Sequence, residues 1–326
     1  CSAGNHAQGV ALAASKCGIS SLICLPDTAP ISKVEATKGY GAQVCLVPGV
    51  YDDAYNKALE LKEEHGYTFV HPFDDEYVIA GQGTIGLEIM NEMSDVDAVL
   101  VPIGGGGLIS GVACAIKSIS PHVKVYGVQA AGAPSMYNAI HHGKMEALTS
   151  VSTIADGIAV KKPGELTYEM VKNYVDDIAL VTEDEIAAAI LALIEKQKMI
   201  AEGAGAVSVA AAMFHKFPLE GKKVVSLISG GNIDVTSLSR VIDRGLMKSG
   251  RTTSLLIELA DKPGQLMEVS RIIAQCGGNV ISVHHERNGE TESINGCYLR
   301  LSLETRNYDH VQQITQALRD AGFKIV

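Results

Sequence analysis

The sequence predicts an α/β protein built on a mostly parallel sheet, followed by a small separate domain with the ferredoxin-like βαββαβ order. Helical patterns alternate with continuous runs of valine, isoleucine and leucine from residue 5 to about residue 245. Such runs are typical of parallel strands that helices cover on both faces. A break follows at Lys248-Ser249-Gly250, and beyond it the apolar residues of one strand alternate strictly with polar ones. That alternation indicates a strand with one exposed face.

Up to residue 103, glycines and turn residues separate the predicted elements. The first helix ends at Gly18, and Pro26-Asp27 ends the first strand. We expect helices over residues 5–17, 34–40, 52–64 and 83–93, strands over residues 22–25, 44–47 and 98–103, and a further strand that closes at Phe69-Val70.

The same alternation continues to the break, and the tail then changes its pattern. Before the break we expect strands over residues 123–129 and 224–228 and a helix over residues 183–198 that Thr182 caps. In the tail, Asp261-Lys262-Pro263-Gly264 forms a turn. The predicted tail consists of strands over residues 254–259, 280–283, 297–304 and 323–326, and of two helices with the apolar stripes Leu266, Val269, Ile273, Cys276 and Val311, Ile314, Leu318, Ala321.

Composition and charge exclude two classes of partner. The 326 residues carry a net charge of −10 without a basic stripe, so we expect neither nucleic-acid nor membrane binding. The longest uncharged window, residues 98–116, contains Pro102 and divides into strand, loop and helix, so it is not a membrane span. The 7 cysteines form no CxxC pair and mostly have apolar neighbours, which indicates reduced residues in a cytoplasmic protein.

Three polar or glycine-rich loops are candidates for a ligand site. The first, Ser2-Ala3-Gly4-Asn5-His6-Ala7-Gln8-Gly9, leads into a helix whose N-terminal N–H groups can receive an anion. The second runs from Gly104 to Ser110 between a strand and a helix, and its consecutive glycines favour a phosphate cradle over a flexible turn. It has neither the Walker A nor the GxGxxG spacing. The third, Ser229-Gly230-Gly231-Asn232, follows a buried strand, where ligands bind in open α/β sheets.

In this order, the three loops resemble those of the fold-type II pyridoxal-phosphate enzymes, and most closely the threonine/serine dehydratases (threonine ammonia-lyases). Supporting phrases are His71-Pro72-Phe73-Asp74, Gly81-Gln82-Gly83-Thr84, Ala155-Asp156-Gly157 and Glu202-Gly203-Ala204-Gly205-Ala206. The tail resembles an ACT domain, a regulatory amino-acid-binding module. The resemblance implies an N-terminally truncated fold-type II enzyme with a small α/β domain (residues 1–74), a large cofactor-binding α/β domain (75–248) and an ACT domain (251–326).

The resemblance also implies roles for individual residues. Asn5 would hydrogen-bond the 3′-oxygen of pyridoxal 5′-phosphate, and Ser229 would face its pyridine nitrogen. The cofactor phosphate would lie on the backbone N–H groups of Gly104, Gly105, Gly106, Gly107 and Leu108. The substrate carboxylate would lie in the loop formed by Ser2, Ala3, Gly4, Asn5 and His6.

Three of these positions imply the type of reaction. A hydroxyl at Ser229 supplies no charge to hold the ring protonated, which favours prompt elimination over racemisation or transamination. Serine racemases of the family carry a serine where Ala3 stands, and alanine has no proton to give. Cysteine synthases carry another residue where His6 stands, so β-replacement is also disfavoured.

Glu202, the Ala206 carbonyl and Ser208 would form a monovalent or divalent cation site by the same resemblance, although serine racemases usually have aspartate at the position of Ser208. The alternative is a buried Glu202 that caps the helix starting near Gly205. The pairs His141-His142 and His284-His285 lack the i,i+4 spacing of helical metal ligands, and we expect surface or strand residues.

The family's Schiff-base lysine lies upstream of the first loop, and no lysine in this sequence has its context. No catalytic residue is therefore assigned, and the sequence as it stands is expected to bind ligands without turnover. The implied parent activity is conversion of L-threonine to 2-oxobutanoate and ammonia, with L-serine to pyruvate beside it. Alternatives are a non-catalytic binder with an ACT sensor, or another fold-type II enzyme such as a serine racemase. Expected partners are an amino-acid substrate, an amino-acid or nucleotide effector, and further copies of the chain in a homodimer or homotetramer.

Overall fold

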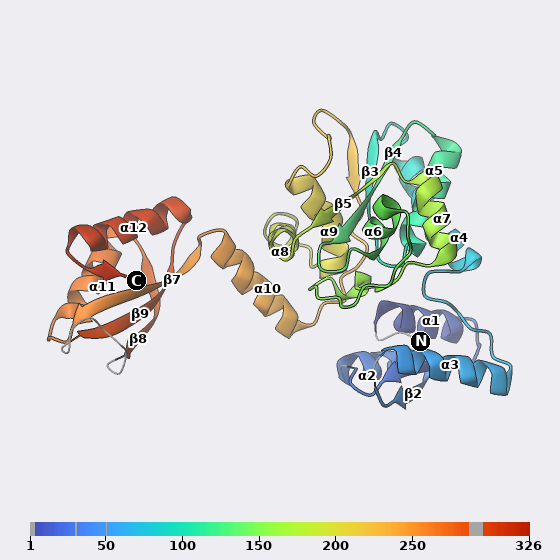
Figure 1. The fold of residues 1–326 in the computed structure, drawn as a ribbon, viewed down its shortest axis with the longest axis horizontal. Helices are drawn as coiled ribbons and strands as arrows, with labels where there is room; N and C mark the ends of the chain where they lie inside the picture. The colour runs from blue at the N-terminus through green and yellow to red at the C-terminus, as the bar shows by residue number, and fades with distance from the viewer. Residues whose placement is uncertain (1–3, 30, 50, 287–295) are drawn as a thin grey trace. The chain divides into compact units, whose positions relative to one another are not determined.

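The computed structural model describes residues 4–29, 31–49, 51–286 and 296–326. The chain divides into two compact units, Cys1–Ile233 and Asp234–Val326, each with its own elements (Figure 1). Within the described residues, no helix is both long and apolar enough to span a membrane.

The first unit begins with a small two-stranded parallel sheet and three helices. β1 and β2 pair in register from Leu22↔Gln43 to Pro26↔Val47. Ala7, Ala11 and Leu25 lie in their common core. The elements are α1 (Asn5–Lys16), β1 (Leu22–Pro26), α2 (Ile31–Gly39), β2 (Gln43–Val47) and α3 (Tyr51–His65).

The prediction of a strand closing at Phe69-Val70 is wrong. The carbonyl oxygen of Val70 lies 3.2 Å from Nε2 of His6, so a side chain takes a hydrogen bond that a neighbouring strand would otherwise make. Without a strand partner, the extended segment forms no ladder.

The larger sheet of this unit has four parallel strands in the order β5-β4-β3-β6. β3 is central and all its residues are buried, which confirms the predicted α/β class. The strands are β3 (Ala98–Pro102), β4 (Lys124–Ala130), β5 (Asp177–Val181) and β6 (Val224–Ser226), the last shorter than predicted.

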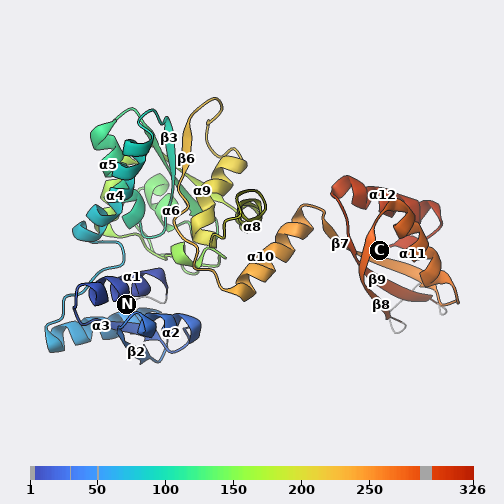
Figure 2. The same cartoon turned by 180° about the vertical axis from the view of Figure 1, so that it is seen from behind.

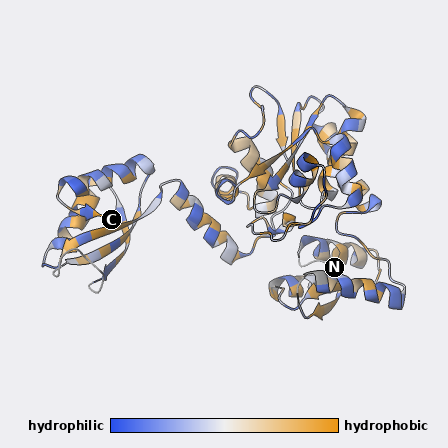
Figure 3. Ribbon diagram, viewed as in Figure 1, coloured by the Kyte–Doolittle hydropathy of each residue, from blue (hydrophilic) through white to orange (hydrophobic). Residues whose placement is uncertain are grey.

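Helices cover this sheet on both faces. Figures 1 and 2 show α4, α5 and α7 along one side and α8 and α9 along the other. Figure 3 shows apolar strands enclosed by helices with polar outer faces. The helices are α4 (Glu76–Glu92), α5 (Gly107–Ile119), α6 (Ser135–His142), α7 (Glu165–Tyr174), α8 (Glu183–Ala192) and α9 (Gly203–Met213), with the short helices η1 (Asp156–Ile158) and η2 (Leu193–Gln197).

Two helix boundaries differ from the prediction by more than a turn. α4 begins at Glu76 rather than residue 83, because the Asp75 carboxylate accepts hydrogen bonds from the N–H groups of Tyr77 and Val78. α8 is capped by Thr182 as predicted, in a capping box with Glu185. Beyond Ala192 the helix continues as a π-helical turn.

The second unit has the predicted βαββαβ order and an antiparallel sheet in the order β10-β7-β9-β8. Two helices pack on one face of this sheet, and Ile257, Val269, Leu299 and Ile314 are buried between them. A helix that was not predicted, α10 (Val235–Lys248), precedes the sheet and belongs to this unit. The other elements are β7 (Thr252–Ala260), α11 (Gln265–Cys276), β8 (Asn279–Glu286), β9 (Gly296–Glu304), α12 (Tyr308–Asp320) and β10 (Lys324–Ile325).

Candidate active site

A chain of side-chain hydrogen bonds joins the start of α1 to two segments that are far away in sequence. The Asn5 amide nitrogen donates to Oε1 of Glu202 at 2.7 Å, at the start of α9. The Asn232 amide nitrogen donates to Oδ1 of Asn5 at 2.8 Å, from the loop after β6. The first and third predicted loops therefore meet at one place.

Glycines allow this close approach. A side chain at Gly230 would overlap Oε1 of Glu202, and a side chain at Gly205 would overlap the carbonyl oxygen of Gly230. The Glu202 N–H also donates to that carbonyl, at 3.1 Å. The loop after β6 thus lies directly on the first turn of α9.

Burial raises the pKa of the Glu202 carboxyl, and the nearby Asp156 carboxylate raises it further. The hydrogen bond from Asn5 and the positive charge of Lys33 act in the opposite direction. Lys33 itself forms an ion pair with Asp156, whose Oδ2 lies 3.0 Å from Nζ. Glu202 is 5% exposed, so the site contains a nearly enclosed carboxyl whose pKa lies above that of an exposed glutamate.

The raised pKa predicts how stability changes with pH. A carboxyl with a raised folded-state pKa binds more protons in the folded state, so stability falls as pH rises through 4.5 towards the raised value. Glu202→Gln keeps an oxygen for the Asn5 amide and removes the ionisation, so it should flatten this fall. The measurement is the slope of urea-unfolding free energy against pH, from about pH 4 to about pH 8. Equal slopes for the two proteins would contradict the prediction.

The second predicted loop is a rigid turn at the start of α5. Gly106, with φ of +101°, is the N-cap of α5, and Gly105, Gly106 and Gly107 are buried. In the described chain no side chain caps this helix, so its first N–H groups remain available to an anion. These donors fit a phosphate group.

Neighbouring residues hold the glycine loop in place. The Thr167 hydroxyl donates to the carbonyl oxygen of Gly105 at 2.6 Å. The Asp74 carboxylate accepts from the N–H groups of Glu165 and Thr167, at 3.1 and 3.0 Å. A side chain at Gly105 would overlap the ring of Phe73. Thr167 lies in no sequence motif, whereas Asp74 and Asn232 belong to the motifs His71-Pro72-Phe73-Asp74 and Ser229-Gly230-Gly231-Asn232 without a predicted role of their own.

Thr167→Val should loosen the glycine loop, because valine has the same shape but donates no hydrogen bond. Among the described residues, the Gly105 carbonyl would keep only its 3.4 Å hydrogen bond from the Gly164 N–H. We expect a loss of about 1–3 kcal/mol of stability and about a tenfold weaker cofactor affinity. Titration with pyridoxal phosphate checks this. Thr84→Val, which removes an exposed hydroxyl bonded to Gly81, is the control, and Thr167→Ser should restore affinity.

The third loop lies at the same end of the sheet as the second, where the parallel strands finish. β3 and β6 are parallel neighbours paired from Ala98↔Val224, so the loops that follow them leave the sheet at the same end. Ser229 is exposed there.

The remaining predicted residues are placed as follows. His6 lies in the first turn of α1, and burial lowers the pKa of its imidazole. Gly4 is the N-cap of α1. Ser2 and Ala3 lie outside the described residues.

The predicted cation ligands are close in sequence, but the side chains of Glu202 and Ser208 already make other hydrogen bonds. The Ser208 hydroxyl donates to the Leu227 carbonyl at 2.7 Å, and Oε1 of Glu202 accepts from Asn5. Ala206 is fully buried in α9. A cation would have to compete with these hydrogen bonds, and the site stays a prediction.

Comparison with known proteins identifies the family. The model of the family described as "Pyridoxal-phosphate dependent enzyme" matches residues 1–230. The chain belongs to this family. A protein from Thermotoga maritima named L-threonine ammonia-lyase is 52% identical over 324 residues, which are 99% of this chain and 80% of that protein.

Solved structures of the family have the same fold. The processed form of threonine deaminase isoform 2 from Solanum lycopersicum superposes with a TM-score of 0.71 and 42% identity, over 74% of this chain and 71% of that one. Maize serine racemase gives a TM-score of 0.70 and 36% identity, over 76% of both chains. The first unit is therefore a fold-type II pyridoxal-phosphate enzyme, as the sequence predicted.

Proposed function

We propose that this protein is a threonine ammonia-lyase that converts L-threonine to 2-oxobutanoate and ammonia, and L-serine to pyruvate. The similarity to the Thermotoga maritima protein supports the substrate class. One observation carries the proposal. Asn5 is hydrogen-bonded both to Glu202 and to Asn232, and Asn232 belongs to the loop after β6, which leaves the sheet at the same end as the glycine loop.

Each loop has a task in this proposal. The uncapped start of α5 holds the cofactor phosphate. Asn5, fixed by Glu202 and Asn232, binds the cofactor ring substituent, and Ser229 contacts the ring nitrogen without adding charge. Gly4, Asn5 and His6, with Ser2 and Ala3 before them, bind the substrate carboxylate at the start of α1. When bound, pyridoxal phosphate withdraws electrons from the substrate Cα, which acidifies its proton and promotes loss of the β-hydroxyl.

A serine racemase is the second candidate, because the maize serine racemase structure is similar. Racemisation needs a second group that returns a proton to the opposite face of Cα. The methyl group of Ala3 has no such proton, which favours elimination.

The test is an assay of the complete gene product with pyridoxal phosphate and each substrate. We expect 2-oxobutanoate from L-threonine and pyruvate from L-serine. Formation of D-serine from L-serine, without any keto acid, would support a serine racemase. Cofactor binding without either product would support a non-catalytic binder and overturn the proposal.

We further propose that the second unit is an ACT domain that binds an amino-acid or nucleotide effector in a homodimer or homotetramer. The βαββαβ order and the antiparallel sheet support this. Ile281 and Val283 on β8 are 57% and 40% exposed, which favours a further protein surface against them. Light scattering gives the number of subunits, and thermal shifts with amino acids and nucleotides identify the effector class. The cytoplasmic location stays a prediction, supported by the six cysteines of the described residues, which are thiols rather than disulfides.

A further inference from the structure

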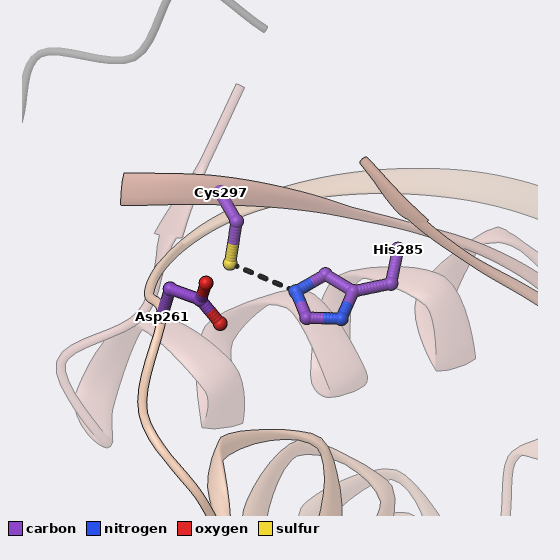
Figure 4. Close-up of side chains that lie close together, drawn as sticks. All are labelled: Asp261, His285 and Cys297. Carbon is purple, nitrogen blue, oxygen red and sulfur yellow. Dashed lines mark hydrogen bonds between the residues drawn. The ribbon is translucent and has the colours of Figure 1, made fainter. Parts of the chain in front are cut away.

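Three side chains with metal-ligating atoms meet at one end of the second unit's sheet. The carboxylate of Asp261, the imidazole of His285 and the thiol of Cys297 each offer a ligand atom, and these atoms lie within 4.8 Å of one another. Figure 4 shows the carboxylate and the imidazole directed toward the Cys297 sulfur. We call these residues the Asp-His-Cys cluster.

Strand register brings the cluster together from three neighbouring segments. β9 lies between β7 and β8, with Cys297 opposite Leu259 and His285 opposite Leu299. Directly opposed residues share a face, and so do residues two apart in a strand. Cys297, Leu299 and His285 therefore project from the same face. Asp261 follows the last residue of β7, beside them.

The surroundings of the cluster are half enclosed. Cys297 is 1% exposed, whereas Asp261 and His285 are exposed. Nε2 of His285 lies 3.0 Å from Sγ of Cys297, and Sγ lies 3.7 Å from the carbonyl oxygen of Leu259. The three side chains line a pocket of about 420 Å³. The turn Lys262-Pro263-Gly264 and the start of α11 form its rim.

We propose that the Asp-His-Cys cluster binds a zinc ion, with its fourth coordination position open to the pocket. A carboxylate oxygen, an imidazole nitrogen and a thiolate sulfur are the three ligand types that zinc takes, and three protein ligands leave one position for water or another small ligand. Around tetrahedral zinc these atoms lie about 3.3–3.6 Å apart, given bonds of about 2.0–2.3 Å. The sulfur–nitrogen pair opens slightly, and each of the other two pairs closes by at most about 1.5 Å from the 4.8 Å limit.

Binding would replace the hydrogen bond between His285 and Cys297. The thiol releases its proton, and the imidazole coordinates through the same Nε2 that now faces the sulfur. The carboxylate and the thiolate together balance the charge of the ion. Without metal, the same atoms form a hydrogen-bonded thiol–imidazole pair, which is the competing explanation of their proximity.

The test is metal titration of the full chain with all other cysteines in place. Co²⁺ serves as the spectroscopic probe, because a thiolate ligand gives a sulfur-to-cobalt charge-transfer band, and Zn²⁺ should displace it. We expect one ion per chain in this site. Cys297→Ser should abolish the band, and His285→Asn and Asp261→Asn should each weaken Zn²⁺ binding at least about tenfold.

Two matched variants control for other thiols and imidazoles. His284 is adjacent on β8 but opposite Arg300 and on the other face, and Cys276 ends α11 outside the cluster. His284→Asn and Cys276→Ser should leave both the band and the affinity unchanged. Absence of the band, or equal losses in the control variants, would overturn the proposal and leave the hydrogen-bonded pair. Circular dichroism of each variant ensures that a lost band is not lost folding.

Discussion

Replacement of Gly111 by alanine is expected to destabilise the first unit by at least about 3 kcal/mol. The alanine methyl group would overlap the carbonyl oxygen of Ile79 and lie 2.6 Å from the backbone nitrogen of Gly83. Both atoms belong to the backbone of α4, so no rotamer change relieves the overlap. The two helices would have to separate along a buried interface that includes Met90, Val112 and Ile116.

Urea unfolding followed by circular dichroism measures this loss. Gly83→Ala is a graded variant, since its methyl group would lie 3.2 Å from the Gly111 carbonyl oxygen, and it should cost less. Gly81→Ala on α4 meets nothing within 4 Å and should be neutral or stabilise by about 0.5–1 kcal/mol. If Gly111→Ala and Gly81→Ala unfolded at the same urea concentration, that result would contradict the close packing of α4 against α5.

The order of the elements was predictable where a strand is buried on both faces or a helix carries an apolar stripe. β3 and α11 are examples, because the apolar pattern of their own residues indicates which side chains are buried. The predicted start of α4, residue 83, lies too far along the sequence. The first turn of the helix lacks a strong apolar pattern and depends on the Asp75 cap. α10 was not predicted at all. The segment at Phe69-Val70 has strand-like residues, yet a strand exists only with a partner.

The candidate site was predictable as three separate loops, but not as a connected network. Glycines and an asparagine in sequence motifs indicate where ligands bind. The contact between Asn5 and Glu202 depends on how α1 meets α9, which no local pattern contains. Thr167 and His285 illustrate the same limit, because each acquires its partner through tertiary structure.

Replacement of Gly205 by alanine is expected to disrupt the site itself. The methyl group would overlap the Gly230 carbonyl oxygen and lie 2.8 Å from the Gly230 nitrogen. The loop from Ser229 to Asn232 would have to move off α9, which would break the hydrogen bond from Asn232 to Asn5. Asn5 would then lose one of the two partners that orient its amide. We expect cofactor affinity to fall at least about tenfold and keto-acid formation by the complete gene product to fall further.

Cofactor titration and a keto-acid assay separate this effect from general unfolding. Gly39→Ala at the end of α2 meets nothing within 4 Å and should change neither quantity. Because Gly205 lies in the first unit, the second unit should keep its unfolding transition. A Gly205→Ala protein with unchanged cofactor affinity would show that the loop after β6 does not help to hold the cofactor. Loss of affinity with the fold retained would instead tie cofactor binding to the Asn5–Asn232 contact, because the three atoms nearest the added methyl group all belong to Gly230 in that loop.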